Sequence, residues 1–146
     1  MIDALDKLSA RIDELQDRLT LALEAGGIGI WDWTIEVQPD GSLGGPLIWD
    51  RQMFMIFQPT WKTDDYTMFA SCLVPEDAGR ALKLLTEAIE KRESYDFVYR
   101  LQSRPGVTVR GRGKCYYNAR GEPYRFVGVC LEAAQCCRGA PVTIPD

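Results

Sequence analysis

The sequence predicts an α+β domain, in which a five-stranded antiparallel sheet carries short helices on one face and follows an N-terminal amphipathic helix. Near the N-terminus apolar residues recur every three or four positions. Further along, β-branched and aromatic residues gather in short runs, with helical patterns between the second and third runs. The last runs are separated by short turns, which indicates consecutive antiparallel hairpins. The expected order is helix, two strands, three helices, three strands.

The N-terminal helix is expected to fill residues 1–25. From Ile2 to Ala22 its apolar residues form a heptad pattern, and most positions between them are charged. A lone helix of this kind exposes an apolar stripe, so we expect a homodimer in which the stripe forms a coiled coil or lies on a sheet. The residues expected at the centre of this contact are Leu5, Leu8, Ile12, Leu15 and Leu19. Gly26 and Gly27 are expected to end the helix.

Local patterns also place the elements that follow. Strands are expected at 28–37, 47–49, 95–103, 107–117 and 124–132, and helices at 51–57, 64–70 and 75–91. Asp50 suits the N-cap of one helix and Pro75 the first turn of another. Glycine and proline mark residues 38–46 as a loop. The expected organisation is the N-terminal helix, a globular domain over 26–134 and a tail over 135–146.

Composition excludes several classes of function. The formal net charge of −4 lacks the basic excess that nucleic-acid binding needs, and no apolar run is long enough to cross a membrane. The five cysteines are an odd set without metal-site spacing, which favours reduced thiols in the cytoplasm and no metal site. The chain contains no histidine, which excludes histidine-ligated haem and removes the commonest general base.

Short motifs occur in five segments of the chain: 21–33, 47–57, 74–77, 95–101 and 121–129. In their residues and in their order they resemble the motifs of the PAS family of sensor domains. Segment 21–33 is similar to the start of the subfamily that begins "A-x-x-G-x-W-x-W". The resemblance covers about residues 20–134. It implies the PAS fold, a signal-input role in signal transduction, and an output domain or partner protein. Glu132-Ala133-Ala134 departs from the usual "D-I-T" exit to such an output domain.

An aromatic set is the candidate ligand pocket. These residues can line an apolar pocket between the sheet and the short helices, or they can simply fill the core. The set is Trp31, Trp33, Trp49, Phe54, Phe57, Phe69, Phe97 and Tyr99. Strand alternation puts Trp31 and Trp33 on one face and Ile30 and Asp32 on the other. The sequence leaves open which face points inward.

The cofactor stays open between none and a non-covalent flavin. Flavin photochemistry of the LOV type, a PAS subgroup, is not expected, because the segment around Cys72 lacks the flanking asparagine and arginine. In addition, Cys130 stands where that subgroup carries a flavin-contacting glutamine. Cysteine-ligated haem is formally open, yet Cys115 and Cys130 suit small apolar positions in a sheet.

The resulting hypothesis is a PAS-type sensory domain that mediates homodimerisation and binds a small ligand or flavin in an aromatic-lined pocket. The alternative is a ligand-free structural dimerisation or protein-interaction module. No catalytic residues are expected, because Glu76 and Asp77 suit a helix N-terminus and Asp96 suits an exposed strand position. A basic strip is expected to bind an anion or an acidic partner, or to protect a solvated sheet edge. It consists of Arg110, Arg112, Lys114 and Arg120.

Overall fold

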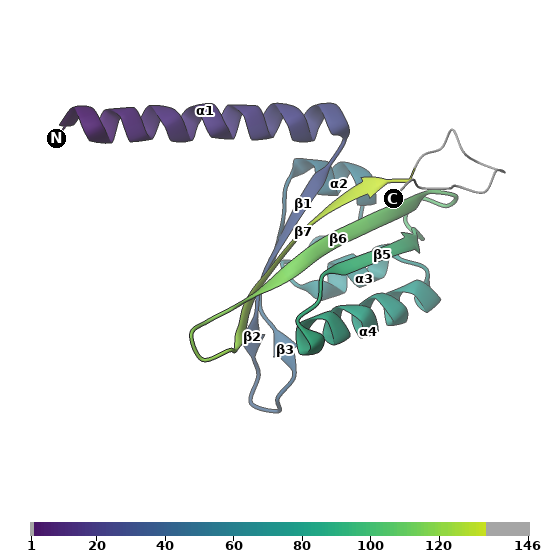
Figure 1. The fold of residues 1–146 in the computed structure, drawn as a ribbon. Helices are drawn as coiled ribbons and strands as arrows, with labels where there is room; N and C mark the ends of the chain where they lie inside the picture. The colour runs from purple at the N-terminus through teal and green to yellow at the C-terminus, as the bar shows by residue number, and fades with distance from the viewer. Residues whose placement is uncertain (1, 134–146) are drawn as a thin grey trace.

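The computed structural model describes residues 2–133 (Figure 1). The helices of this range are α1 (Ile2–Gly26), α2 (Arg51–Phe57), α3 (Tyr66–Cys72) and α4 (Pro75–Lys91). The strands are β1 (Gly29–Thr34), β2 (Glu36–Val37), β3 (Leu43–Gly44), β4 (Leu47–Trp49), β5 (Tyr95–Arg100), β6 (Thr108–Tyr117) and β7 (Pro123–Glu132).

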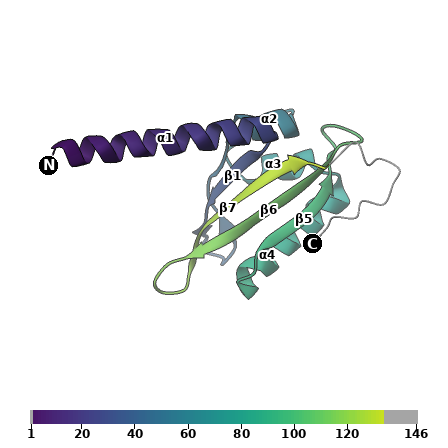
Figure 2. The ribbon, with the colours of Figure 1, turned by 45° about the horizontal axis from the view of Figure 1, so that its top comes forward.

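The main sheet has five antiparallel strands in the order β4-β1-β7-β6-β5. Figure 1 shows α3 and α4 behind one face of this sheet, while the other face carries no described helix. In both Figure 1 and Figure 2, α1 extends away from the sheet and approaches the rest of the chain near α2. The predicted α+β fold, with helices on one face and an N-terminal helix, is confirmed.

The inward face of β1 carries the tryptophans. Trp31 and Trp33 are buried, whereas the Asp32 side chain accepts a hydrogen bond from Arg125 Nε at 2.9 Å on the outer face. Trp31 pairs with Trp49 of β4 on one side and with Gly128 of β7 on the other. This register answers the question that strand alternation alone left open.

A second small hairpin corrects the prediction for residues 28–46. The expected first strand is divided, because β1 stops at Thr34 and Glu36–Val37 form the separate strand β2. The expected loop contains β3, which pairs with β2 through Glu36 and Gly44. Gly45, with φ +109°, brings the chain back so close to β1 that a Cβ atom there would collide with the Thr34 carbonyl oxygen. Only glycine fits this approach. Strands of two residues have too little alternation to reveal themselves in a sequence.

The caps of the helices follow local sequence. The Met53 N–H donates to Asp50 Oδ1 at 3.0 Å, as expected for the N-cap of α2. α3 begins two residues later than expected, because Asp65 accepts from the Thr67 N–H at 2.9 Å and caps it. α1 runs through Gly26, and Gly27 takes the left-handed conformation with φ +64°.

Candidate functional site

The predicted pocket residues separate into three locations. Trp31, Phe69 and Tyr99 line an enclosed cavity between the sheet and the helices. Trp33 instead lines an open hollow at the lower end of the domain, which we call the outer groove. All eight pack in or against the core, and four of them line neither hollow: Trp49, Phe54, Phe57 and Phe97. Sequence reasoning missed Leu47, Tyr66, Leu85 and Tyr95 in the cavity wall.

The enclosed cavity has a volume of only about 30 Å³. It is small because aromatic rings lie directly on glycines of the sheet. A Cβ atom at Gly128 would collide with the Trp31 ring, and one at Gly111 would lie 2.7 Å from the Tyr99 hydroxyl. Trp31 also stacks on Phe126, with ring centroids 5.3 Å apart. The side chains predicted to surround a ligand therefore occupy the space beside the sheet themselves.

One polar contact lies beside this cavity, between the Tyr99 hydroxyl and Cys130 Sγ at 3.0 Å. Burial raises the pKa of Cys130 to about 12 and raises the pKa of Tyr99 well above its ordinary value. Both groups are consequently protonated at neutral pH, and the thiol is no nucleophile. Cys130 pairs with Gly111 across the strands and Cys115 with Phe126, so the two cysteines are not cross-strand partners.

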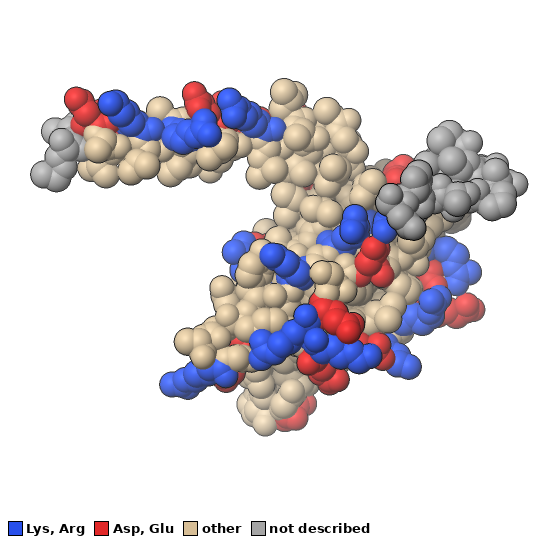
Figure 3. Space-filling model, viewed as in Figure 1, with Lys and Arg blue, Asp and Glu red and all other residues tan. Residues whose placement is uncertain are grey.

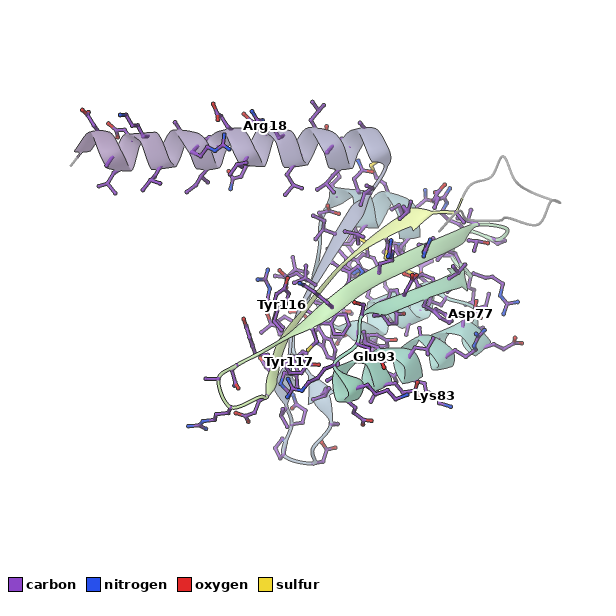
Figure 4. The ribbon with its side chains drawn as sticks, viewed as in Figure 1. Arg18, Asp77, Lys83, Glu93, Tyr116 and Tyr117 are labelled. Atoms are coloured by element: carbon purple, nitrogen blue, oxygen red, sulfur yellow. The ribbon has the colours of Figure 1, made fainter. Side chains whose placement is uncertain are left out.

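The position of Asp77 suggested only that it stabilises the N-terminus of a helix, but its side chain also binds Arg100 of β5. It is 2% exposed and accepts from both the backbone N–H and the guanidinium of Arg100, at 2.7 Å and 3.0 Å. These hydrogen bonds from Arg100 are the main cause of a lowered pKa for Asp77. Figure 4 places Asp77 on α4, beside β5. The carboxylate therefore connects α4 to the edge strand.

The basic strip is partly neutralised. Arg110 donates two hydrogen bonds to Asp96, at 2.9 Å and 2.7 Å, and Arg112 reaches the same carboxylate at 3.5 Å. The Lys114 ammonium group lies over the Tyr116 ring instead. Within residues 2–133 no group of three or more Cys, Asp or Glu side chains can hold a metal ion. Two of the four cations of the strip thus share the Asp96 carboxylate.

The outer groove has a volume of about 730 Å³ and opens between the β2–β3 hairpin, α4 and the turn from β6 to β7. Its walls include Leu43, Ile89 and Pro123. Tyr117 forms part of the floor and donates a hydrogen bond to the Ile89 carbonyl at 2.6 Å, and Figure 4 shows it where β6 meets the end of α4. The groove adjoins the enclosed cavity, because Tyr66 and Leu85 line both.

The heptad residues of α1 are exposed. Leu5, Leu8, Ile12, Leu15 and Leu19 have between 48% and 64% of their surface accessible. Figure 3 shows charged side chains along the upper edge of α1 and uncharged ones along its lower edge. Dimerisation through this stripe stays a prediction. No helix among the described residues is both long and apolar enough to cross a membrane.

Comparison with protein families decides the classification. The family model described as the PAS fold matches residues 47–130. This chain belongs to the PAS fold family. The match covers the strands β4 to β6, the helices between them and most of β7. The narrower assignment to the subfamily with the "W-x-W" first strand stays a prediction.

The relatives of this PAS domain are segments of signalling proteins. The chain is 29% identical over 124 residues to Escherichia coli K12 DgcE, named "Probable diguanylate cyclase"; this covers 84% of the chain but 11% of DgcE. A crystal structure of a sensory box histidine kinase/response regulator from Burkholderia thailandensis superposes with a TM-score of 0.61 at 28% identity, covering 83% of this chain and 88% of that one.

A third match is the N-terminal domain of a diguanylate cyclase with a PAS/PAC sensor from Marinobacter aquaeolei. It covers 72% of this chain and 94% of that domain, with a TM-score of 0.55 and 14% identity. At this identity the likeness concerns the fold alone.

The interior of this PAS domain does not fit a flavin. Small-molecule sites usually enclose about 300 to 1,000 Å³. The enclosed cavity offers about 30 Å³, room for one or two water-sized molecules. Cys72, the thiol nearest to a LOV-type position in sequence, is 1% exposed, and its Sγ contacts the Met68 carbonyl oxygen at 3.4 Å. It is absent from the cavity wall.

Proposed function

We propose that this PAS domain is the signal-input part of a longer signalling protein and that it acts as a pair of copies joined through α1. The observation that carries the signal-input role is the match to DgcE over 124 residues, because that segment belongs to a much larger protein named for an enzymatic activity. The histidine kinase of Burkholderia thailandensis supports the same arrangement. Catalysis is then the work of an output domain, and the domain described here regulates it.

The exposed stripe of α1 supports the pairing. An isolated helix of about 25 residues gains most of its stability by burying an apolar face. Within the described chain, five heptad residues of α1 stay at least 48% exposed. A second copy of α1 supplies the same stripe and closes it with twofold symmetry. Residues 1–25 are thus proposed as the dimerisation segment and residues 26–134 as the sensory domain.

The pairing is tested by replacing Ile12 and Leu15 together with aspartate. The wild-type chain is expected to sediment as a dimer at micromolar concentration, and the double variant as a folded monomer. Ala10→Asp, which places a charge on the opposite face of the same helix, is the control and should stay dimeric. If the double variant dimerises with unchanged affinity, the α1 contact is wrong.

The signal-input role is tested by exchange. Replacing the matched 124-residue segment of DgcE with this chain should preserve cyclase activity and make it sensitive to the Ile12→Asp/Leu15→Asp pair. A chimera whose activity is unchanged by that pair of substitutions would contradict a regulatory role for α1.

We also propose a cytoplasmic location, which the free thiols of Cys72, Cys115 and Cys130 support.

The size of the enclosed cavity favours a second candidate, a ligand-free dimerisation module. At about 30 Å³ the cavity excludes a flavin or haem. Denaturing the purified protein and analysing the supernatant by absorption and mass spectrometry tests this candidate. Stoichiometric release of a chromophore would overturn this candidate.

A further inference from the structure

The apolar stripe of α1 has one basic flank and one uncharged flank. In heptad notation, with positions a to g, Leu5, Ile12 and Leu19 take position a, and Leu8, Leu15 and Ala22 take position d. On one side of the stripe, the g positions include Arg11 and Arg18. On the other side, the e positions include Ser9, Gln16 and Leu23, none of which is charged. The flanks therefore distinguish the two directions in which a second α1 can lie against the stripe.

An antiparallel pair of helices would bring like charges together. In that arrangement an a residue packs against a d residue, so Ile12 meets the partner's Leu15. Position g then faces position g, which places Arg11 beside the partner's Arg18, and twofold symmetry repeats the contact. Arg11 also pairs with Glu14 of its own helix at 3.1 Å, but this exposed pair offsets only part of the repulsion. The basic flank thus disfavours the antiparallel pair.

A parallel pair in register avoids this repulsion. Position g then faces position e of the partner's next heptad, so Arg11 lies beside the partner's Gln16 and Arg18 beside the partner's Leu23. Isoleucine at position a with leucine at position d is typical of parallel two-stranded coiled coils, and Ile12 and Leu15 follow this pattern. Both the stripe and its flanks therefore favour the parallel pair.

Leu23, which faces the partner's Arg18 in a parallel pair, lines a hollow between α1 and α2. This junction hollow has a volume of about 420 Å³. Its lining consists of Thr20, Leu23 and Glu24 of α1 together with Asp50, Arg51, Gln52 and Met55. The three α1 residues take positions b, e and f, so the hollow lies beside the stripe and not on it. A second copy can thus cover the stripe without displacing α2.

The charge of the junction hollow is complementary to Arg18. The carboxylates of Glu24 and Asp50 outnumber the guanidinium of Arg51 in its lining. Arg18, labelled in Figure 4, forms no ion pair within residues 2–133. A guanidinium brought to the mouth of this hollow is attracted to it, because the lining carries a net negative charge.

We propose that α1 pairs with α1 of a second copy in parallel and in register, and that Arg18 of each copy enters the junction hollow of the other. The inference rests on the proposed pairing through α1 and adds its direction and a charged contact. Both domains then lie at the same end of the coiled coil. Because α2 carries the buried residues Met53, Ile56 and Phe57, the contact connects the core of one domain to the helix of the other.

Cross-linking tests the direction of the helices in a Leu8→Cys/Leu19→Cys variant. A parallel pair brings each new thiol against its own counterpart, whereas an antiparallel pair brings position 8 against position 19. Within one helix the two positions are about 16 Å apart, too far for a disulfide. After oxidation in glutathione buffer, mass spectrometry of tryptic peptides identifies the linked positions.

We expect links from 8 to 8 and from 19 to 19. Links from 8 to 19 in a dimer would overturn the parallel direction and leave the pairing through α1 intact. A dimer with neither link, or a monomer, would overturn the pairing and this inference with it.

Charge removal tests the junction contact through the sign of its effect. Arg18→Gln should weaken the dimer about 2- to 30-fold in sedimentation equilibrium, because two symmetric contacts are lost. Arg11→Gln is the matched control on the same flank and should change the affinity less than about 2-fold, because it faces the neutral Gln16. Unchanged affinity in Arg18→Gln would overturn the junction contact. A tighter dimer in either variant would reveal relieved repulsion between arginines and overturn the parallel direction.

Discussion

α1 and α4 are both amphipathic helices, yet only α4 buries its apolar face within the described residues. α4 packs Ala81, Leu85, Ala88 and Ile89 into the core of its own domain. The leucines of α1 remain about half exposed or more. The two helices show that an apolar stripe predicts a face to be buried, but does not identify the surface that buries it.

The attachments of the two helices differ as well. α4 begins at Pro75, is tied to β5 by the Asp77 to Arg100 hydrogen bonds and ends at Arg92 in a left-handed conformation. α1 joins the domain at its C-terminal end, where Ile28 N–H donates to the Leu23 carbonyl at 2.8 Å. α4 is thus part of the folding unit, whereas α1 is available to a second chain.

The largest expected effect on stability comes from comparing two leucine substitutions, one on each helix. Leu85→Ala on α4 should lower the free energy of unfolding by about 2–5 kcal/mol, because it opens a cavity in the core. Leu15→Ala on α1 should change the unfolding of the monomeric domain by less than about 0.5 kcal/mol. Urea denaturation followed by tryptophan fluorescence at low protein concentration measures both. Equal losses would mean that α1 belongs to the same folding unit.

A second prediction concerns the carboxylate that secures α4. The pKa of Asp77 is lowered in the folded state from its ordinary value of 3.8, so its stabilisation is present at neutral pH and disappears as the pH falls through the folded pKa. Asp77→Asn should lower the free energy of unfolding at pH 7 by about 1.5–3 kcal/mol and flatten its decline below about pH 4. Asp13→Asn, on the exposed α1, is the control and should leave the pH profile of the domain unchanged. If the free energy of unfolding of Asp77→Asn falls below about pH 4 as steeply as that of the wild type, the Asp77 carboxylate is not the cause of that fall.

The smallest effects compare one glycine at the end of α1 with one inside α4. Gly27→Ala should cost about 1 kcal/mol, because φ is +64° there and no neighbouring atom lies within 4 Å of an added Cβ to alter the result. Gly79→Ala should stabilise α4 by about 0.5–1 kcal/mol, since an added Cβ there also meets nothing within 4 Å. Circular dichroism during urea denaturation detects both. Effects of the same sign would show that the backbone of Gly27 is not under this constraint.

Local chemistry explains what the sequence could predict of the fold. The Asp50 cap and the start of α4 at Pro75 depend on neighbouring residues, so their motifs sufficed. The β2–β3 hairpin was missed, because it depends on the close approach at Gly45 that only the folded chain creates. Asp77 was read as a helix N-terminal charge, because its partner Arg100 lies 23 residues further along the chain.

The candidate site was less predictable than the fold. Tyr95 shares the inward face with Phe97 and Tyr99, so strand alternation contained a signal for it. Tyr66 and Leu85 come from helices whose rotation toward the sheet is set by packing, and no local pattern fixes that rotation. The outer groove combines residues of the hairpin, α4 and the turn from β6 to β7, and no local pattern predicted their meeting.

The pairing of β1 with β7 has a mechanical consequence. The chain enters β1 at Gly29, which pairs with Cys130, two residues before the end of β7 at Glu132. A pulling force between these two ends would not load all the inter-strand hydrogen bonds together, as it does when strands slide past each other in shear. The force would first strain the ion pair between Arg104 and Glu132. It would then break the hydrogen bonds between β1 and β7 one residue pair after another, starting at Gly29 and Cys130. The domain would therefore yield at low force and act as a compliant joint along a tensioned chain.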